Sequence, residues 1–251
     1  MIYRIQGLVR SRVDLKNSLS GACFLVGGGY QLPDVRTRLN DPRIFTMGMN
    51  NAATQFTPNL WTGADSPDHY SPGILFNPTI MKFIYMKFVD FVVNGKPMSS
   101  LTNAYFMPWR DAEAKHFFSD RPRIGWWGNV FTLALELLHY LGFRTIYIVG
   151  AGLHVDDRGA YGYESDLEDD ELEFNQCTYD SVVRQVRCIN EASEAHHLDL
   201  ISCTPDSRLN KFLTYAPFDD AFGYEVAMIP EHQTTGLKRP SHSGLRSKLH
   251  S

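Results

Sequence analysis

The chain has 251 residues, which is long enough for one large domain or two small ones with a substantial hydrophobic core. Its formal net charge of -4 excludes a bulk electrostatic attraction to nucleic acid or anionic membranes, although a local basic patch is compatible with it. Charged and polar residues interrupt the apolar stretch 73–93, so we expect no membrane span. Four cysteines without CxxC spacing, and an N-terminal segment that lacks the apolar core of a signal peptide, favour free thiols in a reducing cytoplasm.

The first half of the chain predicts three strands, with one short helix at 32–41. The apolar run 22–26 is typical of a buried parallel strand, and 43–50 and 58–65 are predicted as the next two strands. Each of the three strands ends at residues that suit contact with a ligand: Gly27, Gly28, Gly29, Asn50 and Asp65.

The second half predicts helices that alternate with strands. Leucines recur at helical spacing after Gly128, and a β-rich run follows them and ends at Gly150 and Gly152. Segment 101–120 shows no clean period and is predicted as a loop with a short helix. Helices are predicted at 78–92, 128–141, 181–199 and 206–215, and strands at 145–150 and 199–205.

This order of elements predicts a single α/β domain over residues 1–231, with a mostly parallel sheet and helices on both faces. The basic, Gly/Ser-rich segment 232–251 is predicted to be a poorly ordered tail. In an open parallel sheet, a ligand binds outside the carboxyl ends of the strands. We therefore expect the strand ends named above to converge on one crevice.

The glycine triplet excludes two familiar nucleotide motifs. Leu32 stands where the dinucleotide fingerprint GxGxxG needs its third glycine, and no GK[ST] follows for a P-loop. Glycines at a strand end still allow backbone N–H groups to face a phosphate or a ribose. The alternative is a tight turn without any ligand.

Asn50 and Asp65 are candidate contacts to a nucleoside. An amide can both donate to and accept from a base edge or a ribose hydroxyl, and a carboxylate accepts from hydroxyls. Both residues would also suit simple turns, since Asn and Asp stabilise turns through their own backbone.

Five further residues are candidates for phosphate binding or catalysis. Arg123 can pair with phosphate, and Gly128 and Asn129 would place helix N-terminal amides near an anion. His154 lies just past a predicted strand end and could act as a general base, while Tyr161 lies on a following loop that could close over a ligand.

The ordered set of motifs resembles the family 42 sialyltransferases. It also resembles a related domain family that includes an archaeal 6-hydroxymethylpterin diphosphokinase. "FLVGGGYQLPDV…IFTMGMNNA" looks like the sialyltransferase pattern "GxGPSL…cN", and "GNVFTLALELLHYLGFRTIYIVGAGL" and "ISCTPDSRLNKFLTYAP" are similar to later segments.

The resemblance implies a Rossmann-like fold and a metal-independent transfer from a nucleotide sugar. By this resemblance, Gly28 and Asn50 correspond to residues that contact a cytidine nucleotide. Arg123, Gly128 and Asn129 correspond to the region that binds the donor, and Tyr161 corresponds to a tyrosine that stabilises the leaving phosphate.

The chain departs from the family pattern at several positions. Tyr30 and Gln31 replace a Pro-Ser pair, Gly152 replaces an aspartate, and no histidine stands near 175–181, where the sialyltransferases have their catalytic one. His154 or Asp180 is then the expected base.

Three functions follow as hypotheses. The first is a glycosyltransferase-like enzyme that binds a nucleotide-activated sugar, needs no cofactor, and acts on a hydroxyl of a glycan, a small molecule or DNA tethered by the basic tail. The second is a magnesium-dependent diphosphokinase acting on a small alcohol. The third is a catalytically degenerate nucleotide-binding or structural protein. Each is compatible with a homo-oligomer.

Overall fold

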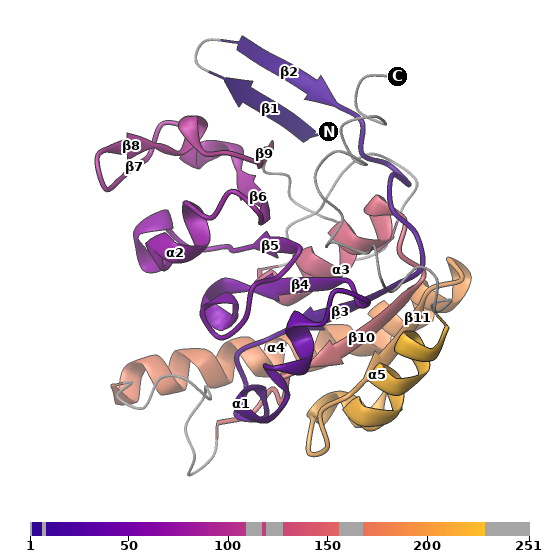
Figure 1. Cartoon of the computed structure of the whole chain (residues 1–251). Helices are drawn as coiled ribbons and strands as arrows, with labels where there is room; N and C mark the ends of the chain where they lie inside the picture. The colour runs from indigo at the N-terminus through magenta and orange to yellow at the C-terminus, as the bar shows by residue number, and fades with distance from the viewer. Residues whose placement is uncertain (1, 7–8, 109–116, 119–127, 156–167, 229–251) are drawn as a thin grey trace.

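The computed structural model describes residues 2–6, 9–108, 117–118, 128–155 and 168–228, and a ten-stranded sheet runs through it (Figure 1). The strand order is β12-β11-β10-β3-β4-β5-β6-β9-β1-β2, and β7 and β8 form a separate pair. The strands are β1 Ile2–Gln6, β2 Val9–Val13, β3 Ala22–Val26, β4 Thr46–Met49, β5 Leu60–Thr62, β6 Met81–Tyr85, β7 Val92–Val93, β8 Lys96–Pro97, β9 Ala104–Met107, β10 Thr145–Val149, β11 Asp199–Ser202 and β12 Thr214–Tyr215. The α-helices are α1 Leu32–Val35, α2 Pro72–Leu75, α3 Val130–Leu141, α4 Asp169–Ala195 and α5 Phe218–Ala227.

Strand β3 is the point at which the chain changes direction across the sheet. From β3 the chain adds β4, β5, β6 and β9 on one side, and it then returns to add β10, β11 and β12 on the other. All of these neighbours pair in parallel, and only β1 and β2 join the sheet antiparallel. The carboxyl ends of β3 and β10 therefore lie side by side at a topological switch point, where open α/β sheets bind their ligands.

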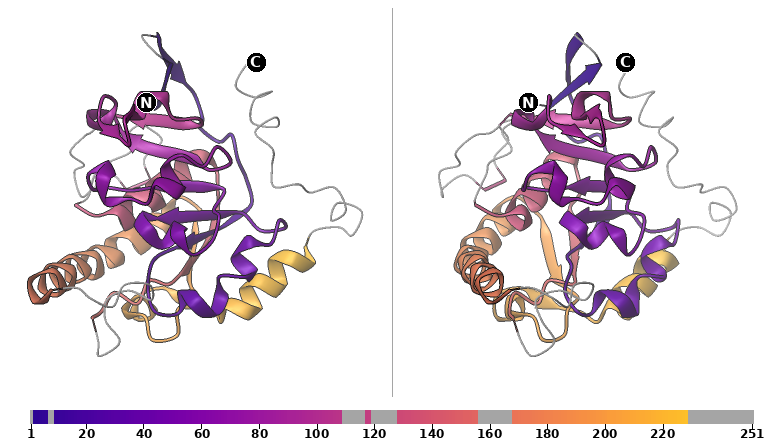
Figure 2. Two further views of the ribbon diagram at one scale, coloured as in Figure 1. Left: turned by 60° about the vertical axis from the view of Figure 1, so that its left-hand side comes forward. Right: turned by 90° about the vertical axis from the view of Figure 1, so that its left-hand side faces the viewer.

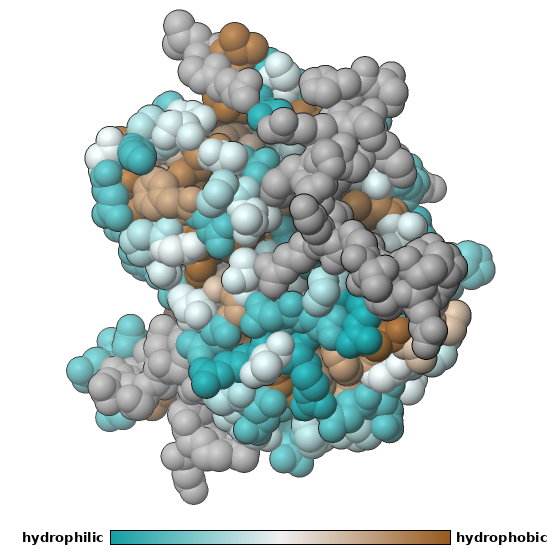
Figure 3. All heavy atoms as spheres, in the orientation of Figure 1, coloured by the Kyte–Doolittle hydropathy of each residue, from teal (hydrophilic) through white to brown (hydrophobic). Residues whose placement is uncertain are grey.

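Helices cover both faces of the sheet. Side chains alternate between the faces along a strand, so Cys23 and Leu25 of β3 pack in one core with α3 and α4, while Phe24 and Val26 pack in another with α1 and α5. Figure 2 shows these helix pairs on opposite sides of the strands. In Figure 3 the surface over α1 and α5 is largely hydrophilic, as expected for helices whose apolar sides face the sheet. The predicted fold class, Rossmann-like α/β with a mostly parallel sheet, is confirmed.

Two segments that were predicted as helix or loop contain strands in the structure. Residues 78–92 were expected to be a helix, but Met81–Tyr85 form strand β6, and all five side chains are buried. A strand buried on both faces is mostly apolar, so its apolar residues also fit helical spacing. Ala104–Met107, within a segment predicted as loop and short helix, form the neighbouring strand β9.

The later helices also have different bounds. The helix predicted over 181–199 is α4, which already begins at Asp169 with a capping box between Glu168 and Glu171. The helix predicted over 206–215 is only a short 3-10 turn, Arg208–Lys211, capped by the Ser207 hydroxyl. Strand β12 and helix α5 follow it and were not expected.

The remaining sequence predictions have separate outcomes. All four cysteines are free thiols; Cys23 and Cys203 are buried, and Cys177 and Cys188 are exposed. Within the described ranges, no helix is both long and apolar enough to cross a membrane. The predicted tail 232–251 lies outside the described residues.

Candidate functional site

A cavity of about 280 Å³ opens at the switch point, near the lower end of the range for small-molecule sites. The ends of four of the five predicted strands contribute to it, as do the start of α3 and one face of α4. Its described lining comprises Gly27, Gly28, Gly29, Tyr30, Met49, Asn50, Ala64, Asp65, Gly128, Asn129, Val130, Phe131, Gly150, Ala151, Gly152, Leu153, His154, Phe174, Asn175, Thr178, Tyr179 and Val182. The structure thus brings together ten of the residues that the sequence marked as strand ends or candidate contacts: Gly27, Gly28, Gly29, Asn50, Asp65, Gly128, Asn129, Gly150, Gly152 and His154. The end of the strand predicted at 199–205, Thr204 and Pro205, was also expected at the cavity but is not part of the described lining.

The floor of the cavity is a close contact between the backbones that follow β3 and β10. A Cβ atom on Gly27 would lie 2.6 Å from the Gly150 carbonyl oxygen, and one on Gly29 would lie 2.7 Å from it. The N–H groups of Gly27 and Gly29 donate to the carbonyls of Val149 and Gly150, each at 2.8 Å. Two of the three glycine amides are therefore occupied, and of these three only the amide of Gly28 donates to no described residue and is left to a ligand.

One wall of the cavity carries Asn50 and Asp65, and we call it the Asp65 wall. Asn50 has a left-handed backbone, φ 46°, which Asn tolerates better than most residues. The hydroxyl of Tyr70 joins the two residues: it accepts from the Asp65 N–H at 2.6 Å and lies 3.4 Å from both Asn50 Oδ1 and Asp65 Oδ2.

Tyr70 is held firmly behind this wall. It is 5% exposed, and its ring meets that of Trp61 edge-on with centroids 4.9 Å apart. Gly63 allows this approach, since a Cβ there would lie 2.5 Å from the Tyr70 ring. Burial, and then the nearby Asp65 charge, raise the pKa of Tyr70 well above its ordinary value, so the hydroxyl stays protonated.

The N-terminus of α3 forms a further part of the lining. Asn129 is the N-cap, and its Oδ1 accepts from the Thr132 N–H at 2.8 Å, as the predicted helix start at 128 and 129 requires. The first-turn amides at Val130 and Phe131 have no acceptor within the helix. Together with the helix dipole they favour an anion at this side of the cavity.

A second wall of the cavity comes from the segment 151–155, which we call the His154 wall. The His154 Nδ1 atom lies 3.0 Å from the Gly152 carbonyl oxygen. A carbonyl can only accept, so Nδ1 carries the proton, and in the neutral ring Nε2 keeps its lone pair. Gly152 leaves room for this ring, because a Cβ at 152 would lie 3.1 Å from His154 Cε1. The arrangement places the His154 imidazole at the cavity with Nδ1 directed toward the Gly152 carbonyl.

Asp180 was also expected as a base, but the structure places it in a polar network beside the cavity. Its carboxylate pairs with Arg208 Nη1 at 2.5 Å and accepts from Gln176 Nε2 at 2.9 Å. These hydrogen bonds, that from Arg208 first, lower the pKa of Asp180 below its usual range. A carboxylate stabilised in its charged form is a weak base.

Sequence reasoning missed the cavity-facing side of α4. Phe174, Asn175, Thr178, Tyr179 and Val182 line the cavity at helical spacing. They precede or begin the segment predicted as helix, and the capping box at Glu168 was the signal that could have extended it. Phe174 is 71% exposed at the cavity, and Tyr179 supplies a hydroxyl near the expected position of a catalytic histidine.

Two predicted site residues, Arg123 and Tyr161, lie outside the described residues. Within the described part of the chain, no group of three or more His, Cys, Asp and Glu side chains is placed to hold a metal ion.

No protein-family model matches the sequence, and no curated protein matches it significantly. Among solved structures, the fold is similar to that of the sialyltransferase CstII from Campylobacter jejuni, solved in complex with a substrate analogue, cytidine-5'-monophosphate. The match covers 78% of this chain and 85% of that chain, with 13% sequence identity and a TM-score of 0.42. A likeness this distant carries no argument about activity.

Proposed function

We propose that the chain is a glycosyltransferase-like enzyme that binds a nucleotide-activated sugar in this cavity and transfers the sugar to an acceptor hydroxyl. One observation carries the proposal: the cavity lies at the switch point of a parallel sheet and combines hydroxyl-binding side chains, helix N-terminal amides and an imidazole base. Binding, charge stabilisation and proton transfer could then occur within one site.

The Asp65 wall suits the nucleoside part of the donor. The Asp65 carboxylate accepts hydrogen bonds from the ribose hydroxyls, and the Asn50 amide can both donate and accept. The phosphates lie toward the first-turn amides of α3 and the amide of Gly28, where the positive end of the helix dipole stabilises their charge. From the sequence, Arg123 and Tyr161 are assigned to the leaving phosphate.

The His154 wall suits the acceptor. His154 Nε2 removes the proton of the acceptor hydroxyl, and the acceptor oxygen forms a bond to the anomeric carbon of the sugar. The bond between that carbon and the phosphate oxygen breaks, and the electron pair leaves with the nucleotide. This scheme needs no metal ion, and Nε2 must be the unprotonated nitrogen, as the Gly152 contact of Nδ1 requires.

Calorimetry with a panel of nucleotides and nucleotide sugars tests the binding step. We expect nucleotides of one nucleobase to bind. We expect Asp65→Asn to weaken the affinity of the protein for them about tenfold, through the loss of a charged hydrogen bond. The matched control is Asp90→Asn, an exposed carboxylate that does not line the cavity. No binding by any member of the panel at millimolar concentration would contradict the proposal.

The donor that binds is then offered to glycan, small-molecule and DNA acceptors. The variant His154→Asn can keep a donor near the Gly152 carbonyl while losing the Nε2 base. We expect it to bind the donor normally but to transfer the sugar about 100-fold more slowly. His197→Asn, at an exposed histidine with a left-handed backbone, is the control. Normal transfer by His154→Asn would exclude His154 as the base.

A further inference from the structure

The turn that carries His154 has a strained backbone. Leu153 is 7% exposed and has φ 58°, in the left-handed region that residues other than glycine rarely adopt. Such a conformation is unfavourable for a residue with a side chain and persists only when its surroundings hold it in place. The contacts around residues 151–155 therefore decide where His154 points.

The segment after β11 holds the first half of this turn. The Ser207 hydroxyl donates to the Ala151 carbonyl at 2.5 Å. The Arg208 N–H donates to the Gly152 carbonyl at 3.1 Å, and Arg208 Nη1 donates to the Leu153 carbonyl at 3.1 Å. The Gly152 carbonyl thus accepts from both the Arg208 backbone and the His154 ring, so the position of Arg208 and the tautomer of His154 are connected through one oxygen.

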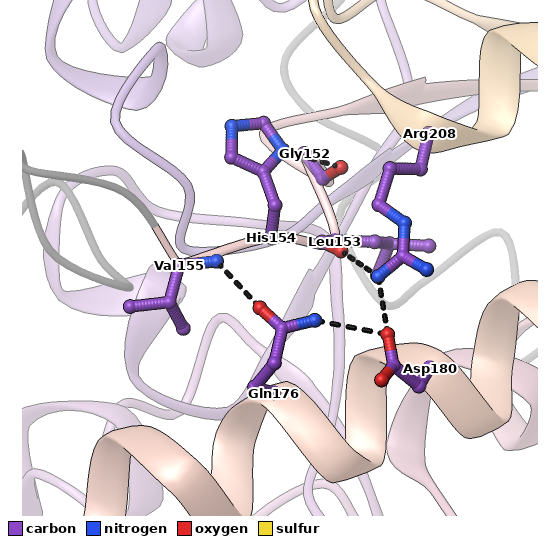
Figure 4. Close-up of polar contacts among 7 residues, drawn as sticks. All are labelled: Gly152, Leu153, His154, Val155, Gln176, Asp180 and Arg208. Atoms are coloured by element: carbon purple, nitrogen blue, oxygen red, sulfur yellow. Dashed lines mark hydrogen bonds and ion pairs between the residues drawn. The ribbon is translucent and has the colours of Figure 1, made fainter. Parts of the chain in front are cut away.

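Helix α4 holds the second half of the turn, and Asp180 joins the two supports (Figure 4). The Val155 N–H donates to Gln176 Oε1 at 3.0 Å. Asp180 Oδ1 accepts from Gln176 Nε2 at 2.9 Å and from Arg208 Nη1 at 2.5 Å. The same oxygen therefore fixes the amide that holds Val155 and the guanidinium that holds Leu153, while Figure 4 shows the imidazole pointing away from it.

We infer that Asp180 is a positioning residue, which fixes the Nδ1–H tautomer and the direction of His154 through Arg208 and Gln176. Both supports of the turn end on its carboxylate, and Asp180 does not line the cavity among the described residues. That His154 then acts as a base rests on the proposed function, but the positioning itself does not.

Nitrogen NMR of the His154 side chain tests the inference without any ligand. The resonances are assigned by their loss in His154→Asn, and spectra are recorded at about pH 8.5, two units above the ordinary pKa of histidine. We expect the ratio of the Nδ1–H to the Nε2–H tautomer to fall about threefold or more in Asp180→Ala, as the loss of one hydrogen bond implies. Asp180→Asn keeps an acceptor oxygen without the charge and should show a smaller change.

Two matched variants define the scale of the measurement. Gly152→Ala presses directly on the imidazole and must shift the His154 resonances. Glu191→Ala breaks the exposed Arg187–Glu191 pair on the same helix and should leave them unchanged. Backbone amide spectra of β1 and β2 verify that each variant is folded.

An unchanged tautomer ratio in folded Asp180→Ala, with Gly152→Ala shifting as stated, would overturn the inference. If Asp180→Ala does not fold, a wild-type ratio in Asp180→Asn overturns it equally. Failure of nucleotide sugars to bind would refute the proposed function but leave this result standing, so the two outcomes are distinguishable.

Discussion

The Asp65 wall and the His154 wall line the same cavity, but different forces hold them. Behind the Asp65 wall stand buried aromatic rings, with Tyr70 5% and Trp61 1% exposed. The His154 wall is held by polar contacts at the surface, where the Arg208 and Asp180 side chains are 31% and 42% exposed. Packing at the first wall responds little to salt, whereas exposed ionic contacts are screened and titrate. The Asp65 wall is therefore expected to be rigid and the His154 wall adjustable.

A buried lysine behind the Asp65 wall gives the largest expected effect. Lys82 pairs with Trp61 in the register of β5 and β6, is 0% exposed, and donates from Nζ to the Asn77 and Ile80 carbonyls at 2.8 Å each. Burial lowers its pKa to about 7, well below the value of about 10.4 that is usual for an exposed lysine. Between these values the unfolded chain binds more protons, so the free energy of unfolding rises with pH, by roughly 3 kcal/mol from about pH 7 to about pH 10.

The variant Lys82→Met should lose this rise. Urea denaturation of both proteins at the two pH values measures it, and Lys96→Met, at an exposed lysine, should keep the wild-type rise. A rise of equal size in Lys82→Met would show that Lys82 is charged in the folded protein at neutral pH.

Overpacking the Asp65 wall should have the next largest effect. In Gly63→Ala the new methyl group would overlap the Tyr70 ring, which Trp61 prevents from moving. We expect the free energy of unfolding to fall by about 2 kcal/mol, as measured by urea denaturation. Gly223→Ala in α5, where a Cβ meets nothing within 4 Å, should be neutral or stabilising. A Gly63→Ala protein as stable as wild type would mean that this wall is softer than its burial indicates.

The smallest effect is expected at the His154 wall in acid. Arg208, and then Gln176, hold the pKa of Asp180 below its ordinary value. The contribution of the carboxylate is therefore present above that ordinary value and is lost only as pH falls through the lowered one. A carbon NMR titration of the Asp180 carboxyl should show a midpoint below about 3.9, and Arg208→Met should raise it. Equal midpoints in the two proteins would remove Arg208 as the cause.

The location of the cavity could be predicted from the sequence, but its supports could not. Gly27, Asn50, Asp65 and Gly150 were placed together because parallel strands bring their carboxyl ends to one edge of a sheet. Asp180 was recognised only as a carboxylate, since its partner Arg208 lies 28 residues away and nothing local indicates their contact. Tyr70 was missed for the same reason: its hydroxyl reaches Asn50 from 20 positions along the chain.

Errors in the elements have a second physical cause. Met81–Tyr85 is buried on both faces, so its apolar residues satisfy a helical and a strand period at once. The first half of α4 carries mostly polar residues and lacks the apolar stripe by which 181–199 was recognised. Because the helix was predicted to begin only at 181, Phe174 and Tyr179 were not included in the predicted site.

The contact between Gly27 and Gly150 constrains how this protein can diverge. Each would place a Cβ atom against the carbonyl oxygen of the other, at 2.6 Å and 2.5 Å, so a side chain at either position clashes whatever stands at the other. No pair of compensating substitutions opens the floor. A change in the shape of the cavity must therefore arise in the two walls and α4 rather than in its floor.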